Sequence, residues 1–225
     1  MTPAPATPPR LTAAFWRTRR SAALAGIAFA VLLLTAMTMM RIALAEDSLT
    51  TLQSDAGSRR LIAWSLHLVP FAGIAFLWFI GVVREQLGDI EDRLFSTVFL
   101  GSGLLFLAML FSGAAATSGV LELTSGPNPD PAVWAFGRDS TRTLVSVYAM
   151  RMAAVFTLSV STVGIRTGAM PRWVSYLGYL TALVLLLAAG EHKWTQLVFP
   201  LWVLLVSVVI LLTRPRAQAS PTSPG

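Results

Sequence analysis

The segment from Leu61 to Val83, LIAWSLHLVPFAGIAFLWFIGVV, decides the class of this protein. It contains no Asp, Glu, Lys or Arg. A helix rises about 1.5 Å per residue and needs roughly 20 apolar residues to cross about 30 Å of hydrocarbon. Only helices and closed barrels satisfy the backbone in lipid, and this segment lacks the alternation of a barrel strand. It therefore predicts a membrane-spanning helix.

The rest of the 225-residue chain repeats this pattern. Its residues are 55% hydrophobic and 12% charged, whereas soluble domains carry roughly 25% charged residues. We predict an all-α transmembrane helical bundle at 21–213, flanked by a disordered basic arm at 1–20 and a disordered tail at 214–225. The expected spans are 21–44, 61–83, 94–120, 143–165, 173–190 and 194–213.

The basic residues between these blocks predict the orientation. Cytoplasmic segments carry an excess of Lys and Arg, and the first helix usually dominates. A cytoplasmic N-terminus places ten basic residues inside: Arg10, Arg17, Arg19, Arg20, Arg84, Arg93, Arg166, Arg172, Arg214 and Arg216. It places six outside: Arg41, Arg59, Arg60, Arg138, Arg142 and Lys193. We therefore expect both ends of the chain in the cytoplasm.

The first block allows a second interpretation. Arginines precede its apolar stretch, and Ala43-Leu44-Ala45 before Glu46 fits the small-x-small pattern of a signal-peptide cleavage site. The uncharged core from Ala22 to Met40 is longer than the 7–15 residues typical of such signals. An uncleaved first helix is therefore favoured, and cleavage after Ala45 would leave five spans.

Several kinds of chemistry are excluded or unsupported. The chain has no cysteine, so it has no disulfide, thiolate metal site or cysteine nucleophile. It also lacks the P-loop, nucleotide-binding glycine and HExxH motifs. The pI near 11.0 reflects arginines between the apolar blocks, so nucleic acid is not an expected partner. The two histidines, His67 and His192, lie away from the bilayer centre, and we expect no haem, metal or other cofactor.

Polar groups within spans are costly and are functional candidates for that reason. Arg151 lies about eight residues, or about 12 Å, from the outer end of the fourth span, with Tyr148 three residues before it on the same face. His67 lies at a similar depth in the second span. We predict a polar vestibule open to the outer face, with Arg151 and His67 at its floor and with Glu122 and Gln196 nearby.

Two prolines support this hypothesis, and simpler roles compete with it. Pro70 and Pro200 are predicted to kink their helices, and each removes the amide that would pair with the carbonyl four residues earlier. The competing interpretations are that Arg151 extends to the lipid headgroups and that His67 pairs with a neighbouring helix.

Small residues recur every four positions in the third span (Ala108, Ser112, Ala116) and in the fourth (Ala149, Ala153, Thr157, Ser161). Such stripes let helices approach closely, so spans three and four are expected to pack on each other or on a partner in a homo- or hetero-oligomer. The lipid bilayer is the other expected partner.

Two segments, GAMPRWVSYLGYL at 168–180 and RLFSTVFLGSGLL at 93–105, resemble stretches of uncharacterised bacterial, chiefly actinobacterial, membrane proteins of similar length with about six helices. The resemblance implies a bacterial plasma (inner) membrane and no known activity.

The absence of catalytic motifs favours a non-catalytic sensor, accessory subunit or scaffold. A small transporter or permease is the first alternative, with Pro70 and Pro200 as pivots. A membrane-embedded enzyme acting on a lipid or quinone is the second, and His67 would then be its acid–base group.

Overall fold

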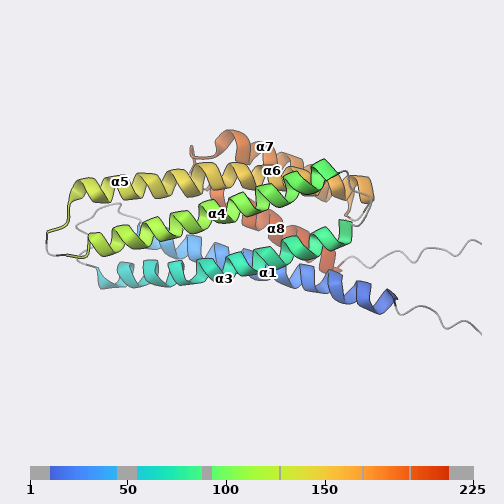
Figure 1. Ribbon diagram of the computed structural model, residues 1–225, viewed down its shortest axis with the longest axis horizontal. Helices are drawn as coiled ribbons and strands as arrows, with labels where there is room; N and C mark the ends of the chain where they lie inside the picture. Colours follow the sequence, from blue (N-terminus) through green and yellow to red (C-terminus); the bar gives the residue numbers. More distant parts are fainter. Residues whose placement is uncertain are drawn as a thin grey trace, which may run out of the picture.

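The computed structural model describes residues 11–44, 55–87, 93–126, 128–168, 170–192 and 194–212, and the regular elements in these ranges are all helical (Figure 1). The α-helices are α1 (Leu11–Ala43), α3 (Ala56–Leu87), α4 (Arg93–Leu123), α5 (Pro131–Arg142), α6 (Met150–Thr167), α7 (Arg172–Ala188) and α8 (Thr195–Leu212). A π-helical segment, η2 (Thr143–Ala149), joins α5 to α6 without a break. The predicted all-α bundle is confirmed for these ranges.

Five helical segments are long and apolar enough to cross a membrane: Arg20–Ala43, Ala56–Arg84, Ser96–Leu123, Pro131–Thr167 and Thr195–Leu212. The sixth, α7, is an apolar helix of 17 residues, close to the length that a span requires. The chain is accordingly a multi-pass membrane protein. The possible cleavage site after Ala45 lies outside the described residues.

These six apolar helical segments form a ring in chain order. Each helix packs on the next, α1 on α3, α3 on α4, α4 on α6, α6 on α7 and α7 on α8, and α8 closes the ring against α1. The described ends of the chain, at Leu11 and Leu212, lie at the same end of the bundle as the α6–α7 turn (Figure 1). We call this the Gly168 end, and the opposite one, with the α4–α5 connection, the Asp130 end.

Two helices extend beyond the expected ranges. α1 begins at Leu11 rather than at residue 21, so the second half of the expected disordered arm is helical. No proline follows Pro9 until Pro70, and the residues between Leu11 and Arg20 all tolerate a helix. Residues 1–10 and 213–225 lie outside the described residues.

The region 121–142, which the expected spans leave as a connection, is mostly helical. α4 continues to Leu123, and α5 occupies Pro131 to Arg142. The carboxylate of Asp130 caps α5 by accepting a hydrogen bond of 2.8 Å from the backbone N–H of Ala132. Pro131 fits the first helical position, where no amide donor is needed. α5 continues through η2 into α6, so the fourth span begins at Pro131 rather than at the expected residue 143 and ends at Thr167.

Phenylalanine side chains fill the centre of the ring. Five helices contribute fully buried rings that meet in what we call the phenylalanine layer: Phe29, Phe76, Phe106, Phe156 and Phe199. Phe76 contacts the other four, with ring centroids 4.5 to 5.8 Å away. Lipid tails are as apolar as these rings, so close packing rather than water exclusion holds such a core together.

The two predicted small-residue stripes have different surroundings. Ala149, Ala153, Thr157 and Ser161 on η2 and α6 are all buried inside the bundle. Near Ser161, Gly178 of α7 approaches so closely that a Cβ at this glycine would overlap the serine hydroxyl. On α4, by contrast, Ala108 and Ser112 are exposed. The stripe on the fourth span therefore packs within the ring, and that on the third lies on its surface.

Candidate functional site

A cavity of about 390 Å³ lies inside the bundle toward the Asp130 end. It exists because the helices differ in length. The hairpin of α7 and α8 turns at Gly190, while α1, α3, α4 and α5 continue past it (Figure 1). Beyond the hairpin, α1 and α5 are the two edges of a row of four helices, and they do not pack on each other as the neighbouring helices do. The cavity occupies the space between them.

The middle of this cavity is basic. Its described lining contains no Asp or Glu and includes four basic side chains: Arg41, Arg138, Arg142 and His192. Arg138 pairs with Asp139 at 3.4 Å, but that carboxylate is exposed on the outside of α5. Thr117 and Thr141 share a hydrogen bond of 3.3 Å across the wall between α4 and α5. The basic side chains therefore concentrate positive charge in a partly enclosed space.

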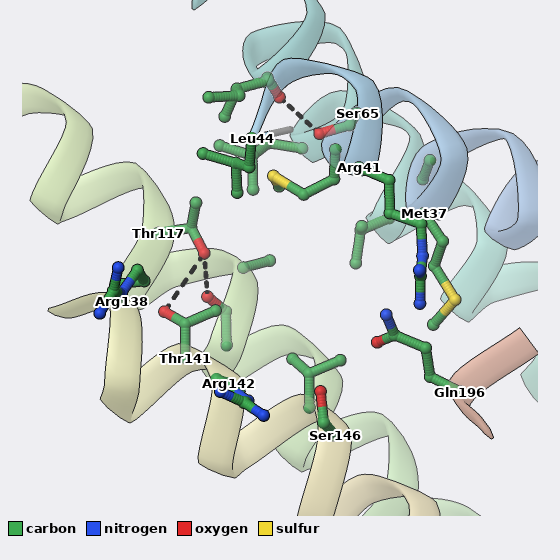
Figure 2. A pocket seen from close by; sticks show the side chains of 18 of the residues that line it. Met37, Arg41, Leu44, Ser65, Thr117, Arg138, Thr141, Arg142, Ser146 and Gln196 are labelled. Carbon is green, nitrogen blue, oxygen red and sulfur yellow. Dashed lines mark hydrogen bonds between the residues drawn. The ribbon is translucent and has the colours of Figure 1, made fainter. Parts of the chain in front are cut away.

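Arg41 is the most unusual of these residues. Its Nε and Nη2 atoms are buried, and among the described residues they have no hydrogen-bond acceptor. The guanidinium lies over the ring of Trp194, 4.9 Å from its centroid, which provides a cation–π contact but no acceptor. Figure 2 shows it extending from α1 toward Gln196 of α8, with Arg142 on the opposite wall. A buried cation without acceptors is costly in an empty site and favourable once an anion enters.

The edge of the cavity is fixed by contacts between η2 and the α7–α8 loop. Arg142 donates a hydrogen bond from Nη2 to the carbonyl oxygen of Gly190, at 3.3 Å. Gly190 has φ +90°, a conformation that favours glycine, and a Cβ there would lie 2.9 Å from Cγ2 of Val147. The turn of the short hairpin therefore requires glycine and holds the arginine at the cavity edge.

Apolar residues close the cavity above and below the basic layer. Toward the Asp130 end, a hydrophobic cluster centred on Ala43 and Ile62, with Leu121 and Trp134 packed against it, covers the cavity. Toward the Gly168 end the cavity is lined by residues that include Leu33 and Leu110. Each of these is one helical turn from a ring of the phenylalanine layer. The open side is therefore lateral, between α1 and α5.

The structure brings one of the five predicted site residues into this cavity. Gln196 lines it. Arg151 and Tyr148 are exposed on the outer surface of the bundle, and Glu122 is exposed near the end of α4. His67 is also exposed, and its Nδ1 lies 2.8 Å from the carbonyl oxygen of Ala63 on its own helix. Arg151 and His67, the predicted floor of the vestibule, therefore do not line this cavity.

The two predicted kink positions do border the site. α3 and α8 each remain one helix through Pro70 and Pro200. The residues four positions before these prolines are Leu66 and Gln196. Both of these residues line the cavity.

The apolar pattern indicates which span holds a polar residue but not the direction of its side chain. The spans that contain Arg151 and His67 begin at Pro131 and Ala56, earlier than the expected 143 and 61, and both side chains are exposed on the outside of the ring. Arg138 and Arg142 were missed as site residues because their segment was expected to be a loop. Their spacing of four residues places them on one face of a helix, and this was the signal available. Arg41 was counted only among the basic residues expected on the outer side of the membrane.

Comparisons with protein-family models, curated proteins and solved structures find no match to this chain. The chemistry of the cavity is therefore the basis for assigning a function.

Proposed function

We propose that this protein is a non-catalytic membrane protein that binds an anionic ligand in the basic cavity, as a sensor or an accessory subunit would. The observation that carries the proposal is the buried guanidinium of Arg41, whose Nε and Nη2 have no acceptor among the described residues. Together with Arg138 and Arg142 it provides planar donors that match the oxygens of a phosphate or carboxylate. The described lining of the cavity contains no Asp or Glu.

The surroundings favour binding over chemistry. The cavity volume, about 390 Å³, falls within the range of small-ligand pockets, roughly 300–1,000 Å³. His192 is the only histidine among the described lining residues, and it is exposed. His67, on which the enzymatic alternative depended, bonds to its own helix. The phenylalanine layer closes the route toward the Gly168 end.

Transport is the second candidate, and one observation favours it. Pro70 and Pro200 lie within α3 and α8, one helical turn after two cavity residues, Leu66 and Gln196. Proline positions next to a central site are the places where transporter helices can break. A transporter would have to open the phenylalanine layer during its cycle. Proteoliposomes loaded with labelled phosphate would show exchange across the membrane if this alternative holds, and none if the protein only binds.

The positive-inside bias supports a topology in which the Asp130 end faces away from the cytoplasm. We place the protein in a bacterial plasma membrane with both chain ends inside. The exposed small residues Ala108 and Ser112 on α4 are the proposed face for an oligomer.

The binding proposal is tested by thermal unfolding in nanodiscs of zwitterionic lipid, with phosphate replacing chloride at constant ionic strength. A ligand at ten times its Kd stabilises by about 1.4 kcal/mol, or about 3–5 °C for a chain of this size. We expect this shift in the wild type and in Arg60→Met, which changes an exposed arginine. Arg41→Met should abolish it. A shift that persists in Arg41→Met, or none in the wild type, would contradict the proposal.

A further inference from the structure

We infer that the ligand of this cavity is an anionic amphiphile: a phosphate or carboxylate carrying an alkyl chain, which enters sideways from the lipid. The inference rests on the proposed anion site and adds the ligand class and the route of entry. It follows from three features: the order of polar and apolar layers in the cavity, the side on which the cavity is open, and its depth.

The layers match an amphiphile. The basic side chains Arg41, Arg138 and Arg142 form one layer. Below them, toward the phenylalanine layer, the lining is apolar and includes Leu33, Ala36, Met37, Val69 and Leu110. A free inorganic anion would leave this apolar part without a partner, whereas an alkyl chain would fill it.

Among the described residues, the open side lies at the level expected for lipid headgroups. The end toward Asp130 is covered by the cluster around Ala43 and Ile62. The gap lies between α1 and α5, directly beyond the turn of the α7–α8 hairpin. A hairpin of helices of 17 and 18 residues spans about 26 Å, so its turn lies near the bilayer surface. Trp194 at this turn is exposed, as expected for an aromatic ring at the headgroup level. A lipid headgroup at this level is adjacent to the gap.

The depth sets the length of chain that fits. Leu33 is eight residues before Arg41 on α1, which corresponds to about 12 Å along the helix. An extended alkyl chain advances about 1.3 Å per carbon, given single bonds of about 1.5 Å. A chain of about nine carbons therefore reaches from the arginine layer to Leu33. Longer chains would have to bend back or extend out through the gap.

The test is a chain-length series of n-alkyl phosphates from two to twelve carbons. Isothermal titration is performed on the protein in zwitterionic nanodiscs, and the signal of empty nanodiscs is subtracted. Each buried methylene should raise the affinity about two- to fourfold, with fourfold as the limit set by full transfer from water. The affinity should rise up to about nine carbons and then remain constant. Nanodiscs containing phosphatidylglycerol should compete with the nine-carbon probe if the gap admits a lipid.

A shorter side chain in the apolar part of the lining should change the chain length at which the affinity stops rising, which a side chain with a purely structural role would not do. Leu33→Ala removes side-chain volume at the end of the proposed chain path, so the plateau should move to longer chains by about two carbons. If Leu33→Ala does not fold, Met37→Ala in the same part of the lining replaces it.

The outcomes separate the ligand class from the proposed function. If inorganic phosphate binds through Arg41 and chain length has no effect, the amphiphile is excluded and the anion site stands. If n-alkanols bind as well as alkyl phosphates and Arg41→Met changes neither, the cavity is an apolar site and the proposed anion function fails. Absence of competition by phosphatidylglycerol would overturn lateral entry from lipid.

Discussion

Replacing Arg41 by Met should stabilise the ligand-free protein, an unusual outcome for a half-buried side chain that packs inside the bundle. The guanidinium has two buried nitrogens without an acceptor among the described residues, and burying an unsatisfied polar group costs about 1–3 kcal/mol. Its contact with Trp194 returns about 0.5–2 kcal/mol. Methionine keeps most of the apolar stem. The expected net gain is about 1 kcal/mol, or about 2–4 °C in Tm.

The assay is thermal unfolding of the purified protein in zwitterionic nanodiscs without added anion, with Arg60→Met as the control for loss of one arginine. Destabilisation by Arg41→Met of about 1 kcal/mol or more would refute the reasoning, because the guanidinium would then have a structural partner. Glu46 and Asp47, which follow on the chain, are the acids nearest in sequence. If Glu46→Gln or Asp47→Asn changes the stability as Arg41→Met does, the arginine is neutralised by its own chain and the anion site is refuted.

Three further predictions concern the fold. Gly190→Ala should destabilise the protein by about 1–3 kcal/mol, because the new Cβ adopts a positive φ and contacts Val147. Adding Val147→Ala should recover the part of this loss that the contact causes. Equal Tm values for Gly190→Ala alone and for the double variant would contradict this. Phe76→Ala, at the centre of the phenylalanine layer, should cost about 3–5 kcal/mol in thermal unfolding, and a cost below about 1 kcal/mol would show that the rings do not pack as described. At Asp55, hydrogen bonds from the Ser58 hydroxyl and then from backbone amides lower the pKa of the carboxyl in the folded protein. The carboxylate therefore stabilises the first turn of α3 above about pH 4, which is the pKa of Asp in an unfolded chain. This stabilisation is lost as the pH falls through the lower pKa of the folded state. The protection of amides in that turn, corrected for the intrinsic exchange rate at each pH, should therefore fall in acid, and Asp55→Asn should remove this pH dependence.

Much of the fold follows from local properties of the sequence. Apolar blocks predicted the spans, and Gly168, with φ +65°, ends α6 where a tight turn was expected. The region around Asp130 shows the limit of this reasoning. Prolines predicted a break in the chain there, but the break covers only the residues between Leu123 and Pro131. The helix then runs through η2, and a π-helical register depends on packing against neighbours rather than on residue propensity.

The candidate site was less predictable because it depends on how six helices are rotated about their axes. The polar residues at the depth of His67 were identified, but a change of one position turns a helical side chain by about 100°. Ser65 therefore faces the cavity while His67 is exposed. The cavity itself results from the difference in length between the α7–α8 hairpin and the other helices, which is a property of the assembled ring.

The most direct measurement is a crystal structure with selenate, whose selenium gives an anomalous signal. Selenate has the charge and shape of the anionic group proposed for the ligand and needs no alkyl chain to occupy the basic layer. The anion site predicts an anomalous peak with selenate oxygens within about 4 Å of the guanidinium groups of Arg41 and Arg142, and no such peak in Arg41→Met. Peaks elsewhere only, or a cavity peak that persists in Arg41→Met, would contradict the central claim that this cavity binds an anion.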